Sequence, residues 1–114
     1  MNKPRILAVS AGWALVATVI WLSVTPQPIQ TGIDQGDKLG HLLAYGSLMF
    51  WFCVLYRPLR VRAFYAAGFI AMGIALEFVQ GWLGYRSFEV ADMVANSVGV
   101  AVGLGIATAI RMTR

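Results

Sequence analysis

Hydrogen-bonding and ionisable side chains recur in this sequence at spacings that place them on one face of a helix. Asp37, His41 and Tyr45 stand four residues apart, and residues separated by four positions lie on the same helical face. A carboxylate close to a histidine is an arrangement that general acid–base catalysis uses. This segment, together with Lys38 beside Asp37, is therefore the first candidate for a functional site.

Two later segments repeat the pattern. Glu77 and Gln80 are three residues apart, and Asp92 and Asn96 are four residues apart, so each pair shares a helical face. If the three segments lie side by side, His41 with Glu77 or Asp92 would supply a catalytic acid and base. No nucleophile stands out among the serines, because none lies in the sequence context of a catalytic triad.

Metal and redox chemistry have little support in the sequence. A metal site groups several ligands, whereas this chain has one histidine, one cysteine and scattered carboxylates. Cys53 has no second cysteine to pair with and lies within an apolar stretch, which indicates a small buried hydrophobic residue. We therefore expect no metal, no cofactor and no disulfide.

The elements that must position these residues are membrane-spanning helices. Of the 114 residues, 59% are hydrophobic and 12% are charged, and the mean hydropathy is +0.70, which is typical of membrane proteins. A helix needs roughly 20 apolar residues to cross about 30 Å of hydrocarbon. Four stretches qualify, at about residues 6–24, 40–56, 63–83 and 92–110. The sequence thus predicts an all-α fold, a four-helix transmembrane bundle that forms a single domain over residues 1–114.

The basic residues indicate the orientation of the bundle, because short cytoplasmic loops carry an excess of lysine and arginine. Lys38 and Arg86 fall on one side of the predicted spans, and seven basic residues fall on the other: Lys3, Arg5, Arg57, Arg60, Arg62, Arg111 and Arg114. We therefore expect both chain ends inside (N-in/C-in). The formal charge of +4 does not indicate nucleic-acid binding, because these residues form short blocks between apolar stretches.

In this orientation all five acidic residues lie in the outer half of the bundle: Asp34, Asp37, Glu77, Glu89 and Asp92. Charged groups inside a bilayer are costly unless they are paired or hydrated, so they mark functional sites by default. A simpler explanation for Asp37 and Asp92 is that each caps the start of a helix. A simpler explanation for Arg86 and Glu89 in the outer loop is that they form an ion pair in solvent. Polar faces on three helices at one depth favour a shared site.

Small residues predict how the last span packs. Gly99 and Gly103 form a G-x-x-x-G motif, which Ala95 and Ala107 extend into a seam of small residues. Such seams let two helix backbones approach closely within a membrane. We expect Gly99 and Gly103 to pack helices rather than bind a ligand, with the last span at the centre of the bundle. An exposed part of the seam would also allow a homo-oligomer to form.

In these residues the sequence resembles the VanZ-like family of small integral membrane proteins. The matching motifs cover nearly the whole chain in order: Ser23-x-x-Pro26, Asp37-Lys38-x-x-His41-x-x-x-Tyr45, Glu77-x-x-Gln80, and Arg86-x-x-Glu89-x-x-Asp92-x-x-x-Asn96-x-x-Gly99-x-x-x-Gly103. The resemblance implies a multi-pass protein of the bacterial cytoplasmic (inner) membrane. Some members of this family are associated with lowered sensitivity to teicoplanin-type glycopeptide antibiotics.

Four functions remain open at this point. The first is a site for an envelope lipid or a lipid-linked precursor, in which Lys38, His41 and Arg86 meet an anionic headgroup. The second is a structural or partner-docking protein that its polar residues hold together. The third is a membrane-embedded enzyme that uses His41 with Glu77 or Asp92 as acid and base. The fourth, a proton or ion pathway, requires a polar trail across the membrane, whereas the inner halves of the spans are apolar.

We rank the lipid site first. The expected partners are the lipid bilayer and an envelope lipid or lipid-linked precursor, and nucleic acid is excluded. The candidate ligand-binding residues are Asp37, Lys38, His41, Tyr45, Glu77, Gln80, Arg86, Glu89, Asp92 and Asn96.

Overall fold

Four long helices make up the computed structural model, which describes residues 2–25, 36–84 and 89–112. They are α1 (Lys3–Val24), α2 (Gly36–Leu55), α3 (Leu59–Leu83) and α4 (Val90–Met112). Each is long and apolar enough to cross a membrane, and the described residues include no strand. The predicted all-α fold with four transmembrane helices is confirmed, although individual helices begin up to four residues earlier than expected.

Local sequence signals explain where helices begin and end. The Asn2 side chain accepts a hydrogen bond from the backbone N–H of Arg5 at 2.8 Å, and Pro4 occupies the first turn of α1, where its missing N–H has no consequence. α1 ends at Val24, just before Thr25 and Pro26, because a residue that precedes proline disfavours helical backbone angles. α3 ends at Leu83, just before Gly84, whose φ of 86° is the left-handed conformation that glycine adopts without strain.

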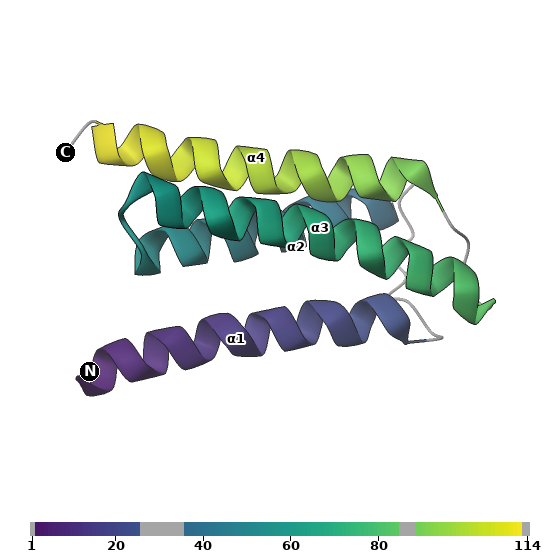
Figure 1. Ribbon diagram of the computed structural model, residues 1–114, viewed down its shortest axis with the longest axis horizontal. Helices are drawn as coiled ribbons and strands as arrows, with labels where there is room; N and C mark the ends of the chain where they lie inside the picture. The colour runs from purple at the N-terminus through teal and green to yellow at the C-terminus, as the bar shows by residue number, and fades with distance from the viewer. Residues whose placement is uncertain (1, 26–35, 85–88, 113–114) are drawn as a thin grey trace.

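The helices run alternately up and down, and α4 packs most extensively against α2 (Figure 1). α2 and α3 occupy the middle, because each of them contacts the other and both outer helices. Within the described residues, α1 and α4 make no close contact with one another. The expectation that the last span is central was therefore wrong: α4 lies on one side of the α2–α3 pair and α1 on the other.

Glycines set the close approach of α2 and α4. A Cβ atom added at Gly99 would collide with the carbonyl oxygen of Leu42, and one added at Gly103 would collide with the carbonyl oxygen of Gly46. A Cβ added at Gly46 would lie 3.2 Å from the carbonyl oxygen of Gly99. The two backbones therefore touch along a strip where neither helix has room for a side chain, which fixes the register of α2 against α4.

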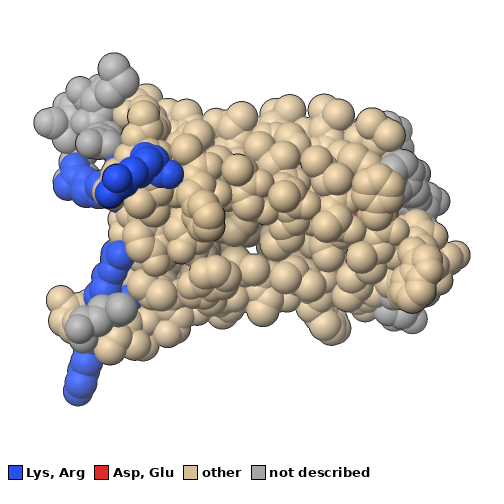
Figure 2. Space-filling view, viewed as in Figure 1, with Lys and Arg blue, Asp and Glu red and all other residues tan. Residues whose placement is uncertain are grey.

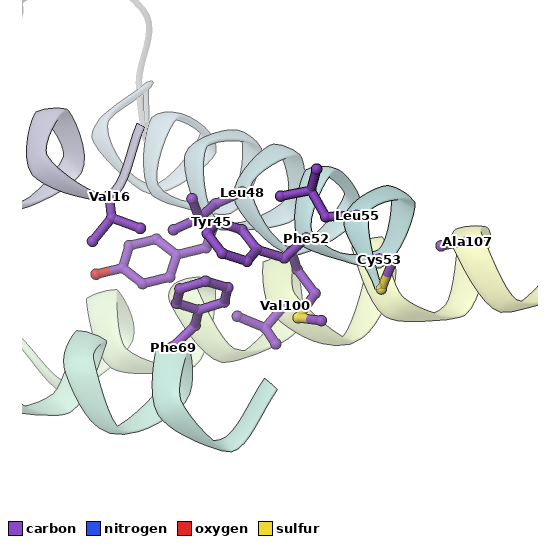
Figure 3. Packing of buried hydrophobic residues seen from close by; sticks show 10 residues of the cluster. Val16, Tyr45, Leu48, Phe52, Cys53, Leu55, Phe69, Val100 and Ala107 are labelled. Carbon is purple, nitrogen blue, oxygen red and sulfur yellow. The ribbon is translucent and has the colours of Figure 1, made fainter. Parts of the chain in front are cut away.

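An apolar core fills the middle of the bundle (Figure 3). Its largest contribution comes from one side of α2, and α1, α3 and α4 add Val16, Phe69 and Val100. The aromatic rings of Phe52 and Phe69 meet edge to face, with centroids 5.1 Å apart, an arrangement that aromatic pairs favour. The fully buried core residues of α2 are Tyr45, Leu48, Met49, Phe52 and Cys53.

The two ends of the bundle differ in charge. Figure 2 shows lysine and arginine side chains gathered at the end where α1 begins. Arg60 and Arg62 were expected in a loop, but α3 begins at Leu59 and includes both, and Arg62 is buried. The helix extends this far because Pro58 stands directly before its first residue, where proline stops a helix from continuing backward but does not hinder its start.

The glycine contact predicts a difference between two neighbouring small residues of α4. Gly103→Ala should destabilise the protein by about 1–3 kcal/mol, because the new methyl group meets backbone atoms that cannot move independently. Gly105→Ala is the matched control, since a Cβ there meets nothing within 4 Å. Thermal unfolding in detergent compares the two variants. Equal unfolding temperatures would contradict the close packing of α2 on α4.

Candidate functional site

Polar residues from three helices meet at the end of the bundle opposite the basic end. The start of α2, the end of α3 and the start of α4 come together there, because neighbouring helices in the chain run in opposite directions. The described side chains that gather at this end are Lys38, His41, Glu77, Gln80, Glu89, Asp92 and Asn96. We call this set the polar cluster.

His41 is held in place by α4. Its Nδ1 atom lies 2.9 Å from Oδ1 of Asn96, and since an amide oxygen only accepts hydrogen bonds, Nδ1 is the donor. The other ring nitrogen, Nε2, then faces Asp92, whose Oδ2 lies 3.9 Å away. A carboxylate on one side and an orienting amide on the other give this histidine a defined orientation, as acid–base chemistry requires.

A glycine on α3 makes room for this arrangement. A Cβ added at Gly73 would lie 3.0 Å from Nδ2 and 3.1 Å from Cβ of Asn96. The side chain of Asn96 therefore fills the space that a side chain at residue 73 would occupy. Gly73 precedes Glu77 by one helical turn, so one face of α3 both accommodates Asn96 and contributes a carboxylate.

Lys38 is surrounded by acidic groups at the edge of the cluster. Its Nζ lies 3.0 Å from Oε2 of Glu89 and 3.7 Å from Oδ1 of Asp92. The exposed fractions of the three side chains are 28% for Lys38, 41% for Glu89 and 9% for Asp92. The cluster is thus open on the side of Lys38 and Glu89 and closed on the side of Asp92.

Glu77 is the deepest acid, with 1% of its surface exposed. Its Oε1 accepts a hydrogen bond from the backbone N–H of Glu89 at 2.6 Å. Arg86 lies outside the described residues. The carboxylate also interacts electrostatically with His41, Glu89 and Asp92. Glu77 therefore ties the end of α3 to the segment that leads into α4.

Two further predicted residues, Gln80 and Tyr45, are almost completely buried. Gln80 is buried, and its Nε2 donates to the carbonyl oxygen of Ser23 at 2.6 Å, so it links α3 to the end of α1. Tyr45 lies one turn below His41 and is 1% exposed. Its hydroxyl group has no hydrogen-bond partner in the part of the chain that the structure describes (Figure 3). Gln80 thus joins the cluster to α1, and Tyr45 borders the cluster from inside the bundle.

The remaining predictions concern the starts of helices. Asp37 is the second residue of α2 and Asp92 the third residue of α4, so both stand in the first turn rather than at the capping position. Acidic residues in the first turn stabilise a helix, because they interact with the positive end of its dipole. The side chain of Asp37 and the whole of Asp34 lie outside the described residues.

The described side chains of this arrangement are suited to hydrogen bonding, ion pairing and proton transfer. The described residues contain no group of three or more histidine, cysteine or acidic side chains placed to hold a metal ion. What the cluster does offer is an oriented histidine and, on its open side, the partly exposed ammonium group of Lys38 and carboxylate of Glu89.

The fold and the cluster define a multi-pass membrane protein with four helices and a polar group of residues at one end. The model of the VanZ/LLP1 family matches residues 6–111. The chain therefore belongs to this family, which confirms the resemblance found in its motifs. No match was found among curated proteins or among solved structures.

Proposed function

We propose that the polar cluster binds the headgroup of an envelope lipid or of a lipid-linked precursor at the outer end of the bundle. The observation that carries this proposal is a partly open ionic network, Lys38 with Glu89 and Asp92, at the end of membrane-spanning helices. Buried charge is costly to place at this depth. A polar ligand that completes the network offsets part of this cost.

The surface around the cluster is suited to an amphiphile. Leu39 and Leu43 of α2 and Val90 and Val94 of α4 are all exposed, and each lies within a few residues of a cluster member. Apolar side chains on the outside of a transmembrane bundle face lipid tails. A molecule with an acyl or polyprenyl chain would therefore lie against these side chains while its headgroup reaches Lys38.

The residues around Lys38 indicate which kind of headgroup the site would bind. From the sequence we expected cationic residues to meet an anionic group, but Lys38 already contacts two carboxylates. Such a site favours a headgroup that carries hydrogen-bond donors as well as negative charge. A phosphate linked to a sugar or to an amino-acid chain has both properties, as lipid-linked envelope precursors do.

The direction of insertion belongs to the same proposal. At the end where α1 begins, the described part of the chain carries Lys3, Arg5, Arg57, Arg60 and Arg62, and this excess of basic residues favours the cytoplasmic side. Both chain ends would then be inside, in a bacterial cytoplasmic membrane, and the polar cluster would face outward. A protein that holds a lipid-linked precursor there would alter what a glycopeptide antibiotic reaches, which is the proposed connection to antibiotic sensitivity.

A second candidate function is an acid–base enzyme that acts on the bound headgroup. The observation that favours it is the orientation of His41, with Asn96 on Nδ1 and Asp92 facing Nε2. An imidazole oriented in this way is able to move a proton to or from a ligand at the opening of the cluster. Binding and catalysis would use the same residues, and they differ in whether the lipid leaves unchanged.

The proposal predicts that a polyprenyl phosphate-linked sugar raises the unfolding temperature of the purified protein in detergent. Lys38→Gln and His41→Ala should weaken this stabilisation, with an apparent affinity about tenfold lower, because each removes a hydrogen-bonding or charged partner of the headgroup. Lys3→Gln is the matched control, since it removes the same charge at the opposite end of the bundle.

Mass spectrometry of the lipid recovered from the same samples separates the two candidate functions. Intact lipid supports binding alone, and a headgroup cleaved by the parent protein but not by His41→Ala supports the enzyme. A lipid effect of equal size in the parent and in both cluster variants would contradict the proposed site. The alternative of a structural or partner-docking protein would then take its place.

A further inference from the structure

Arg62, at the basic end of the bundle, is buried without using all of its hydrogen-bond donors. It stands in the first turn of α3 and is 5% exposed. Its Nε donates to the carbonyl oxygen of Tyr56 at 2.9 Å, and its Nη2 donates to that of Cys53 at 2.8 Å. These carbonyls lie at the end of α2, where a helix has no internal donors to offer them. Arg62 thus caps α2, but its Nη1 has no hydrogen-bond partner among the described residues.

Among the described residues, the positive charge of Arg62 also lacks a counter-charge. The acidic side chains that the structure describes are Glu77, Glu89 and Asp92, and all of them belong to the opposite end of the bundle. A buried charge that lacks an oppositely charged partner is costly. The end of the α2 dipole compensates for part of this charge, and an anion next to Nη1 would compensate for more.

A cavity of about 160 Å³ adjoins this arginine. It lies between the end of α2, the start of α3 and the end of α4, and Figure 3 shows Cys53 of α2 across from Ala107 of α4 in this region. Two arginines and several apolar side chains form its walls: Phe50, Cys53, Val54, Arg57, Arg62, Ala107 and Ile110. Val54 and Ile110 are also exposed on the outside of the bundle, so the cavity borders the surface that faces lipid.

We propose that this cavity binds the phosphate group of an anionic membrane lipid. Arg57 and Arg62 would meet the phosphate, because guanidinium groups match phosphate oxygens in geometry and charge. Val54 and Ile110 would contact the first carbons of the lipid chains. Basic pockets between transmembrane helices are known places for anionic headgroups. The apolar walls and the contact with the lipid-facing surface favour a lipid over free phosphate.

This site is independent of the polar cluster. The fully buried residues Leu48, Met49 and Phe52 of α2 separate the two ends of the bundle, and no residue belongs to both. Neither site therefore requires the other to be occupied.

The test is the unfolding temperature of the full chain in detergent with added phosphatidylglycerol, phosphatidylcholine or inorganic phosphate. The parent protein should be stabilised by phosphatidylglycerol and not by the other two. Arg57→Gln and Arg62→Gln should each lower the apparent affinity for phosphatidylglycerol about tenfold, as expected for the loss of a charged hydrogen-bond donor. Arg60→Gln, the matched control, removes an exposed arginine outside the cavity lining and should bind as the parent does.

Several results would overturn the proposal. Equal binding by Arg57→Gln, Arg60→Gln and the parent would show that phosphatidylglycerol is attracted by diffuse charge alone. If inorganic phosphate stabilised the protein as much as the lipid does, the cavity would be a phosphate site and not a lipid site. Arg62→Gln also removes the cap of α2, so Arg57→Gln, which leaves that cap in place, decides the question if Arg62→Gln does not fold. Lys38→Gln should keep the full effect, which separates this site from the polar cluster.

Discussion

The contact between the backbones of α2 and α4 is the constraint on which the rest of the structure depends. Because Gly99 and Gly103 lack side chains, α4 lies directly on the carbonyl groups of Leu42 and Gly46. This contact fixes the register of the two helices, and the register places His41 opposite Asn96 and Asp92. Any side chain larger than hydrogen in the strip would separate the helices and with them the members of the polar cluster. Packing within the membrane thus determines the geometry of the site.

The bundle keeps its charges at its two ends. The described core between them is built from apolar side chains of α2, with Phe69 and Val100, and it separates the charged groups of one end from those of the other. At the end that carries the polar cluster, the positive charge of Lys38 is matched by carboxylates, whereas at the basic end the described partners of Arg62 are backbone carbonyls. This difference explains why we assign a mixed polar headgroup to the first end and a phosphate to the second.

Much of the fold and part of the site follow from the sequence. Hydropathy alone located the four helices, since the length needed to cross a bilayer leaves few alternatives. Helical periodicity placed Asp92 and Asn96 on one face, because a spacing of four defines a face whatever the neighbours are, and in the structure both lie beside His41. Periodicity does not say which helix a face meets. The role of Gly46 and the peripheral place of α1 were therefore not foreseen.

Other features were missed for a different reason. The partner of Glu77 is a backbone N–H group, and backbone groups leave no trace in a sequence because every residue except proline carries one. The capping of α2 by Arg62 was missed for the same reason, since the acceptors are backbone carbonyl oxygens. Counting basic residues places Arg62 at the basic end of the bundle, but whether its side chain is buried depends on the residue at which α3 begins.

The central claim is that the polar cluster serves a ligand rather than the stability of the fold. The most direct test is the unfolding temperature of Asp92→Asn in detergent, without added lipid, relative to the parent. Because Lys38 keeps Glu89 as a partner, we expect the variant to be as stable as the parent or more stable, as is common where a site is maintained for function. A loss of a few kcal/mol, as expected when a buried charge pair is broken for structural reasons, would show that the cluster holds the helices together and would contradict the account.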